Sequence, residues 1–223
     1  MGLAEFLNIQ TGITAFIGGG GKTTLLRTLG EELAQKHSVL LCTTTKIFPF
    51  PNIPWTNSLE DLMEWKERYS LLCTGTPDQE TGKLLAPQVP FSVLKKAFEY
   101  ILVEADGAAR RPLKAHAPHE PVIPEMTDQV VCVVGISGFG KPIKDAVHRP
   151  ELYTKIASAD MVMPVTVQME AAVLLAEKLH DRVFVNQVET DIDIERAKEL
   201  AKLLDCPVVA GSLHRREYIV CSY

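Results

Sequence analysis

The chain has 223 residues, of which 46% are hydrophobic and 23% are charged, and its formal net charge is −5. These values are ordinary for a globular protein, and they exclude collagen-like, disordered and coiled-coil chains. The acidic balance also argues against a partner of nucleic-acid type, because a nucleic-acid-binding protein needs a basic surface. A chain of this length predicts one large domain, so we expect residues 1–223 to form a single domain.

Nothing in the sequence indicates a membrane or secreted protein. The first twelve residues lack the basic region and the long apolar run of a signal peptide, and nowhere do about 18 apolar residues follow one another. We therefore expect a cytoplasmic protein with no membrane partner. The cysteines form no CxxC pair and lie mostly in apolar runs, which indicates buried, unreactive thiols rather than metal ligands or disulfides. They are Cys42, Cys73, Cys132, Cys206 and Cys221.

Short apolar runs alternate along the chain with longer helical patterns. Strands are expected at 13–17, 39–42, 71–73, 83–86, 101–103, 130–134, 183–185 and 208–210. Helices are expected near the N-terminus, at 22–36, after an N-cap at Ser58, and at 91–98, 169–180 and 194–204. This alternation predicts an α/β fold of the P-loop NTPase type, a three-layer sandwich with a mostly parallel sheet. Turn residues at 74–82 add a small β-hairpin insertion.

In such a fold the carboxyl ends of the parallel strands meet at one edge of the sheet, where ligands bind. The proline-rich stretch 48–55 is expected to be a loop over that edge. Several polar motifs of this sequence follow directly after expected strands. A functional site is therefore expected at these strand ends.

The clearest motif is GGGGKTT at residues 18–24, between the first strand and the first long helix, which is the setting of a P-loop. Its backbone amides and the helix N-terminus would surround phosphate groups. Lys22 would reach the β- and γ-phosphates, and the Thr23 hydroxyl would bind Mg²⁺. The usual pattern GxxxxGK[ST] is incomplete, because Phe16 stands where a glycine belongs, and the shorter GxxGKT remains. The alternative is a glycine-rich turn beside a chance Lys-Thr pair.

The strand at 101–103 continues into Glu104, Asp106 and Gly107. If the strand extends that far, the two acids lie on one side of it. Buried carboxylates are costly without a cation, and Mg²⁺ at a P-loop would supply one. We favour Glu104 as the Walker B acid and Asp106 as a second metal ligand or general base, although the two roles could be exchanged. Gly107 completes an ExxG spacing similar to the DxxG of GTPases, whose glycine amide senses the γ-phosphate. The alternative is two solvated acids in a turn.

The second strand ends in Thr43, Thr44 and Thr45. A threonine hydroxyl here, with Thr45 as the candidate, could complete the Mg²⁺ shell or bind the γ-phosphate. Three β-branched residues are equally typical of an ordinary strand. A second glycine-rich stretch at 135–141 also follows a strand, but no helix is expected after it. We interpret it as an ordinary loop, with a substrate contact as the alternative.

Cations follow the acidic turn at Arg110, Arg111 and Lys114. They could neutralise charge in a phosphoryl-transfer transition state or hold an anionic second substrate, or they could simply be solvated. His116, His119 and Glu120 come next and match no zinc pattern, because flanking prolines prevent a regular helix.

The strand at 183–185 runs into Asn186-Gln-Val-Glu189, where GTPases carry NKxD. There the asparagine supports the P-loop and the acid binds guanine. Glu189 could accept from guanine with a longer side chain, and 211–213 matches the position of a second base-contacting loop. The pattern slightly favours GTP over ATP.

Five blocks of the sequence together resemble the YqeC-like family. They are GGGGKTT at 18–24, TTTK at 43–46, VEADGAARRPLKAHAPHEPVIP at 103–124, VHRPE at 147–151 and FVNQVE at 184–189. The resemblance extends over residues 3–213. This family is associated with accessory proteins of selenium-dependent molybdenum hydroxylases, so the resemblance implies a P-loop nucleotide-binding fold and a role in maturing such an enzyme. It also adds weight to a second-substrate surface made of Lys114, His116, His119, Glu120, His148 and Arg149.

We therefore expect Mg²⁺-dependent binding and hydrolysis of ATP or GTP, coupled to maturation of such a hydroxylase, with the apo hydroxylase or its cofactor or selenium donor as partner. The candidate catalytic residues are Lys22, Glu104, Asp106 and Arg110. The candidate nucleotide-binding residues are Gly18, Gly19, Gly20, Gly21, Lys22, Thr23, Thr24, Gly107, Asn186 and Glu189. The candidate Mg²⁺ ligands are Thr23, Thr45, Glu104 and Asp106. Two alternatives stay open: a small-molecule kinase or activating enzyme, and a nucleotide-gated chaperone with negligible turnover.

Overall fold

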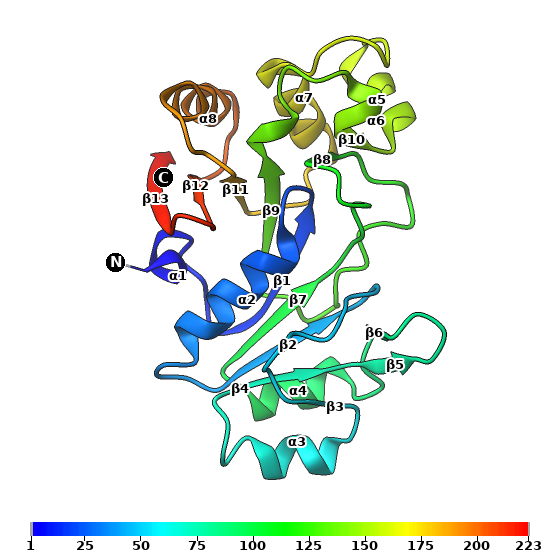
Figure 1. The fold of residues 1–223 in the computed structure, drawn as a ribbon, viewed down its shortest axis with the longest axis vertical. Coiled ribbons are helices and arrows are strands. Elements are labelled where there is room, and N and C mark those ends of the chain that lie inside the picture. Colours follow the sequence, from blue (N-terminus) through cyan, green and yellow to red (C-terminus); the bar gives the residue numbers. More distant parts are fainter. Residues whose placement is uncertain (1, 223) are drawn as a thin grey trace. The chain divides into compact units, whose positions relative to one another are not determined.

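The computed structural model describes residues 2–222, and these residues divide into two compact units (Figure 1). Of the described residues, the first unit contains 2–16, 23–106 and 122–129, and the second contains 17–22, 107–121 and 130–222. No helix within residues 2–222 combines the length and the apolar character that crossing a membrane requires. The single domain expected for residues 1–223 stays a prediction.

Parallel strands in the order β1-β7-β2-β4-β3 form the centre of the first unit. Their bounds are β1 Gly12–Gly18, β7 Tyr100–Glu104, β2 Val39–Thr43, β4 Leu71–Thr74 and β3 Trp55–Thr56. Glu104 is level with Phe16 of β1 on one side and with Thr43 of β2 on the other. The carboxyl ends of these strands therefore lie at one edge, as the sequence predicts.

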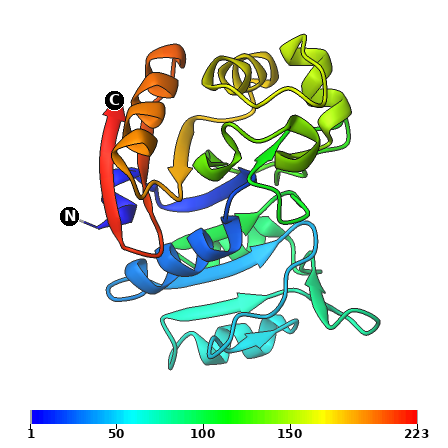
Figure 2. The same cartoon turned by 45° about the horizontal axis from the view of Figure 1, so that its top comes forward.

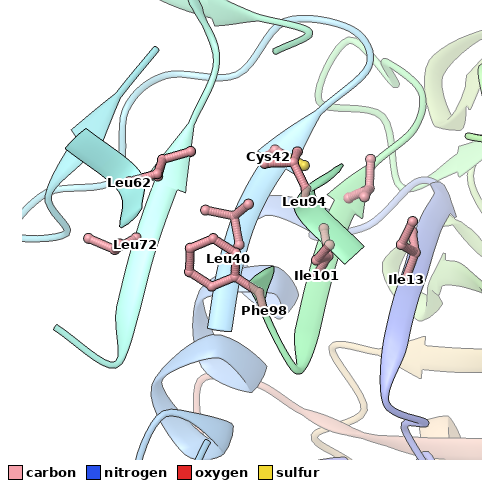
Figure 3. Close-up of a cluster of buried hydrophobic side chains, with 9 residues drawn as sticks. Ile13, Leu40, Cys42, Leu62, Leu72, Leu94, Phe98 and Ile101 are labelled. Carbon is pink, nitrogen blue, oxygen red and sulfur yellow. The ribbon is translucent and has the colours of Figure 1, made fainter. Parts of the chain in front are cut away.

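Helices cover both faces of these strands (Figures 1 and 2). On one face lies α2 Lys22–Leu33, where a side chain at Gly30 would come within 3.0 Å of Leu41 and 3.1 Å of Leu71. On the other face, α3 Leu59–Trp65 and α4 Phe91–Ala97 pack on the cluster of Figure 3. Its buried members are Ile13, Leu40, Cys42, Leu62, Leu72, Leu94, Phe98, Ile101 and Val103. Neighbouring residues of β2 thus face opposite helices, which explains its continuous apolar run.

Two local expectations in the first unit are confirmed. The N-terminal helix α1 Leu3–Phe6 buries Leu3, and its first amides donate to the carboxylate of Glu32 on α2 at 2.8 and 2.9 Å. The Ser58 hydroxyl caps α3 by accepting from the Asp61 amide at 3.3 Å. Both contacts satisfy amides that a helix N-terminus leaves without a partner inside the helix.

The expected hairpin is β5 Thr76–Asp78 paired antiparallel with β6 Lys83–Leu85, and it projects away from β2 and β4 (Figure 1). Ile47 exchanges two backbone hydrogen bonds with Leu84, at 3.1 and 2.7 Å. The hairpin is therefore tied to the residue just before the proline-rich stretch 48–55. Residues 48–54 contain no helix or strand, in agreement with the expected loop, but Trp55 is already part of β3.

The second unit contains β9 Gln129–Gly135, β11 Arg182–Asn186 and β12 Val208–Ser212, which are parallel in the order β9-β11-β12. β13 Glu217–Ser222 then pairs antiparallel with β12. The prediction that 208–210 is the last strand is therefore wrong. The α/β class with mostly parallel strands flanked by helices is confirmed.

The helices of the second unit are α5 Ile143–Ala146, α6 Pro150–Ala157, α7 Val167–Glu177 and α8 Asp191–Leu203, with a 3₁₀ turn at Ile136–Gly138. Two short parallel strands, β8 Leu113–Lys114 and β10 Val147–His148, also belong to it. The expectation that no helix follows the glycine-rich stretch 135–141 is wrong, because the 3₁₀ turn lies inside the stretch and α5 begins two residues after it.

Candidate functional site

The Gly18–Lys22 loop belongs to the second unit and has a backbone that needs glycine. Gly18, Gly20 and Gly21 have φ values of +90°, +76° and +119°. Side chains rarely adopt these angles, whereas glycine does so without steric cost. At Gly19 the angle is ordinary, but an added Cβ would lie 2.6 Å from the carbonyl oxygen of Pro112. The four glycines are therefore required by conformation and by close approach.

Two side chains hold this loop. The Lys22 ammonium, which is buried, donates to the carbonyl oxygen of Gly18. The Asn186 amide nitrogen at the end of β11 donates to the carbonyl oxygen of Gly20 at 2.7 Å, and its amide oxygen accepts from the Leu213 backbone at 3.2 Å. Asn186 thus supports the loop in the manner expected from the sequence.

The segment after the acidic turn also contacts the loop. The Gly20 amide donates to the carbonyl oxygen of Arg111 at 3.2 Å, and the Gly135 amide donates to that of Pro112 at 2.9 Å. An added Cβ at Gly135 would lie 2.8 Å from the Pro112 side chain. The start of the 135–141 stretch is therefore packed against the same segment as the loop.

In the first unit, the Thr23 hydroxyl donates to a carboxylate oxygen of Glu104 at 2.6 Å. Glu104 is the last residue of β7, and its side chain reaches the first turn of α2 because both elements meet at the carboxyl edge. Beside it, the Thr43 hydroxyl donates to the Glu104 carbonyl at 2.8 Å and lies 3.2 Å from the Thr45 hydroxyl. Thr24 is exposed on α2. The two strongest Mg²⁺ candidates are thus in direct contact, and Thr45 is near them in the same unit.

Asp106 is fully buried, but it lies beyond the end of β7. The premise that a continuing strand places Asp106 on the same side as Glu104 is therefore wrong, because β7 ends at Glu104. Carboxylate and hydroxyl oxygens are ligands that Mg²⁺ accepts, so Thr23, Glu104 and Asp106 fit this ion in chemistry. Among residues 2–222, no three His, Cys, Asp or Glu side chains group as a ligand set. A bound Mg²⁺ would therefore also need water or phosphate oxygens.

The three cations of the next segment have different surroundings. Arg110 is exposed, and it and Ala109 have φ values of +61° and +46°. The Arg111 guanidinium donates to the carbonyl oxygen of Asp145 on α5. The Lys114 side chain is fully buried, and its ammonium donates to the Gly107 carbonyl at 2.6 Å. Of the three, Arg110 is exposed, Arg111 is half-buried and Lys114 is buried.

Glu120 connects Lys114 with Arg149, which directly precedes α6. One carboxylate oxygen lies 3.0 Å from the Lys114 ammonium, and Arg149 donates to both oxygens at 2.9 Å. The hydrogen bonds from Arg149 are the largest cause that lowers the pKa of Glu120, to about 2. The hydrogen bond and the positive charge of Lys114 also contribute to this lowering of the pKa. His119 lies at the edge of this group, 3.5 Å from the Arg149 guanidinium. The predicted second-substrate residues are thus largely engaged with one another.

A buried group of acids was not identified from the sequence. His116 donates its backbone amide to Glu177 of α7 at 2.7 Å, and its Nδ1 lies 2.7 Å from the second carboxylate oxygen. Seven residues earlier, the buried Glu170 accepts from the Tyr153 hydroxyl at 3.0 Å. Burial raises the pKa of Glu170 to about 8. The signal in the sequence is an acid on a helix face made otherwise of apolar residues.

The predicted base site lies at the end of β11 and β12. The Ser212 hydroxyl donates to a carboxylate oxygen of Glu189 at 2.9 Å, and Arg215 donates to the Glu189 carbonyl at 2.9 Å. Gln187 has a φ of +68° and accepts from the Ser137 hydroxyl at 2.6 Å. Asn186 at the end of β11 and Glu189 just beyond it therefore both contact residues at or after the end of β12. Binding of a base there stays a prediction.

The cysteines are free thiols, and Cys42, Cys73 and Cys132 are buried. Burial raises the pKa of Cys73 to about 12, so its thiolate is scarce at neutral pH. The prediction of buried thiols is confirmed for these three. Cys206 and Cys221 are only partly buried.

Two comparisons with known proteins extend these observations. Residues 14–151 match a family model described as YqeC protein. A stretch of 155 residues is 30% identical to the uncharacterised protein YqeC of Escherichia coli strain K12. This match covers 61% of the chain and 57% of that relative, so the chain spans less than two thirds of the relative's length.

Proposed function

The chain belongs to the YqeC family, and from this premise we propose that it is a P-loop protein which binds ATP or GTP with Mg²⁺ and hydrolyses the nucleotide. The observation that carries the proposal is the Gly18–Lys22 loop. Three of its glycines have positive φ values, which suit the tight turn of a phosphate-binding loop, and the loop leads into α2. A helix N-terminus with free amides is a common binding site for phosphate. Asn186 adds a second support, because it joins this loop to the predicted base site.

Mg²⁺ is proposed to bind at Thr23 and Glu104, with Asp106 and Thr45 as further candidate ligands. The contact of 2.6 Å between Thr23 and Glu104 supports this, because it brings a hydroxyl and a carboxylate oxygen together. Bound there, the ion would neutralise charge on the phosphate oxygens. Arg110 is proposed to add positive charge in the transition state, since it is exposed beside the acidic turn.

The family resemblance supplies the biological role that we propose. Hydrolysis would serve the maturation of a selenium-dependent molybdenum hydroxylase, with the apo enzyme or its cofactor or selenium donor as partner. The same nucleotide site would also suit a kinase for a small acceptor or a nucleotide-gated chaperone. Phosphate release without any added acceptor indicates hydrolysis, release only with a small acceptor indicates a kinase, and dependence on a client with near-zero turnover indicates a chaperone.

The test is the substitution of Lys22. We expect Lys22→Ala to weaken binding of Mg²⁺·ATP and Mg²⁺·GTP, or to slow phosphate release, by about 10²–10³-fold, because a cation aimed at the phosphates is lost. Calorimetry and a phosphate-release assay measure these quantities. Since Lys22 also donates to Gly18, Lys22→Gln serves as a second variant that keeps a donor but removes the charge.

The matched control is Lys36→Ala, because Lys36 is an exposed lysine just after the same helix. The control should keep wild-type affinity and turnover, and all variants should keep the wild-type melting temperature within a few degrees. If both Lys22 variants bind and hydrolyse like the control, the proposed phosphate site is wrong.

A further inference from the structure

The turn that begins at Gly107 has an unusual backbone. Ala109 and Arg110 both adopt positive φ angles, +46° and +61°, although neither is glycine. Such angles are unfavourable for residues other than glycine and persist where surrounding contacts impose them. No added Cβ at Gly107 would meet any atom within 4 Å, so this part of the turn is open to an approaching group. Something else must hold the turn in shape.

The contact that closes the turn comes from Lys114. Its ammonium donates to the Gly107 carbonyl at 2.6 Å, and this hydrogen bond closes the segment 107–114 into a loop whose two ends are in contact. On the far side of the turn, the Arg111 carbonyl accepts from the Gly20 amide of the glycine loop. The turn that presents Arg110 is thus fixed at one end by Lys114 and at the other by the loop itself.

Burial of Lys114 requires a compensating charge, which Glu120 supplies. A fully buried ammonium is costly unless it is paired and hydrogen-bonded. Glu120 lies 3.0 Å from it, and Arg149 holds Glu120 with two hydrogen bonds of 2.9 Å. Arg149 therefore orients the Glu120 carboxylate, and the negative charge of this carboxylate compensates the positive charge of the Lys114 ammonium. The ion triad fixes the ammonium at the Gly107 carbonyl.

We propose that Lys114 is a positioning residue of the nucleotide site, which holds the Gly107–Arg110 turn in the shape that acts on the terminal phosphate, and that Glu120 and Arg149 keep Lys114 in place. This proposal rests on the proposed nucleotide function. Lys114 does not touch the nucleotide. It acts on the peptide between Gly107 and Ala108, and through it on the placement of Arg110.

The experiment compares Lys114→Met with Lys155→Met, an exposed lysine of α6 in the same unit. Affinity for Mg²⁺·ATP and Mg²⁺·GTP, phosphate release and hydrogen exchange of amides 107–111 are measured on the full chain. Lys114→Met should lower kcat about 10–100-fold and change the affinity less than about threefold, because the phosphates are still bound by the glycine loop. Saturating nucleotide should slow exchange of these amides in the wild type and in Lys155→Met, but much less in Lys114→Met.

A second variant protects the test against misfolding. Glu120→Gln keeps the size of the side chain but removes the charge that holds Lys114, so kcat should fall about three- to tenfold at nearly unchanged affinity. If Lys114→Met does not fold, the kcat and the amide exchange of Glu120→Gln test the positioning role of Lys114. The positioning role is overturned if the folded variants match Lys155→Met in kcat and in exchange while the wild type binds and hydrolyses nucleotide. If the wild type binds no nucleotide, the proposed function itself fails, and this inference fails with it.

Discussion

At position 186, asparagine is needed because its side chain both donates and accepts a hydrogen bond. Its amide nitrogen donates to the Gly20 carbonyl, and its amide oxygen accepts from the Leu213 amide. Aspartate would lack the donor, and an apolar residue would leave both backbone groups without this partner. An added Cβ at Gly21 would come within 2.7 Å of the Asn186 nitrogen, so glycine and asparagine depend on each other here. The loop and the end of β11 are therefore joined at the level of single atoms.

Glu189 carries the prediction on base preference. If its carboxylate accepts the N1 and N2 donors of guanine, Glu189→Gln should weaken GTP by about ten- to a hundredfold, because a charge-assisted hydrogen bond is worth roughly 1.5–3 kcal/mol. ATP should lose little, since its ring N1 has no donor for a carboxylate. We expect a modest GTP preference in the wild type, because Gln187 covers less of a base than the usual lysine. Calorimetric titration with both nucleotides measures the two affinities.

The variant contains its own control, because ATP and GTP share the phosphate site. Loss of affinity for both nucleotides alike would indicate damage to the loop that Asn186 supports. Equal ATP and GTP affinities that Glu189→Gln leaves unchanged would contradict the assignment, and would show that residues 186–189 are an ordinary strand end held by Ser212 and Arg215.

At the scale of elements, the end of β7 places its two acids, Glu104 and Asp106, in different surroundings, from which we predict different roles. Glu104 is still in the strand and accepts from Thr23, whereas Asp106 lies in the turn beyond it. We expect Glu104→Gln to raise the Mg²⁺ concentration needed for half-maximal activity, and Asp106→Asn to slow turnover about 10²–10⁴-fold with nucleotide binding intact. Phosphate release measured across a Mg²⁺ titration separates the two effects.

The matched control is Glu99→Gln, because Glu99 is the exposed acid just before the other end of β7. The opposite pattern in the two site variants would exchange the roles of Glu104 and Asp106. Rates equal to the control in both would remove this turn from the mechanism.

Elements with a strong local signal could be predicted from the sequence, and those that depend on tertiary contacts could not. The strands β1, β2, β7, β9 and β11 are buried apolar runs, and the glycine loop has its own motif. In contrast, β13 contains a short apolar run at 218–221, but its residues are only partly buried and it pairs antiparallel with β12, which a pattern of alternating parallel strands and helices does not predict. The short helix α5 follows Pro142 and the short helix α6 begins at Pro150, and both have too few turns for a periodic pattern.

The same distinction holds at the candidate site. The contact of Thr23 with Glu104 follows from motif order, because parallel strands bring their carboxyl ends together. The triad of Lys114, Glu120 and Arg149 does not, because Glu120 and Arg149 are 29 residues apart and meet only through the packing of the second unit. The family resemblance drew attention to these three residues, but it did not predict that their charges neutralise one another.

For the molecule as a whole, stability should depend on pH through its buried acid. Glu170 lies on α7 and is surrounded by groups from three elements: Tyr153 of α6, Glu177 of α7 itself, and His116 of the 107–121 segment. Burial is the largest cause of its raised pKa, and the charge of Glu177 adds to it. The Tyr153 hydrogen bond acts in the opposite direction but does not cancel the effect of burial. Glu170 is therefore protonated at neutral pH in the folded chain.

This arrangement fixes the sign of the pH effect. The unfolded chain loses the Glu170 proton near the ordinary value of 4.5, whereas the folded chain keeps it up to about 8. Between these two pH values the folded chain binds one proton more than the unfolded chain. The free energy of unfolding therefore falls as pH rises through this window, by at most about 1.4 kcal/mol per pH unit.

The variant Glu170→Gln stays neutral in both states, so its stability lacks this dependence on pH. Its free energy of unfolding relative to wild type should rise from pH 5 to pH 8 and then level off. Urea unfolding at pH 5, 6.5, 8 and 9 measures the difference, with Glu195→Gln as the control because that side chain is 74% exposed. A difference between Glu170→Gln and wild type that stays constant from pH 5 to 8 would mean that Glu170 ionises with its ordinary pKa in the folded protein.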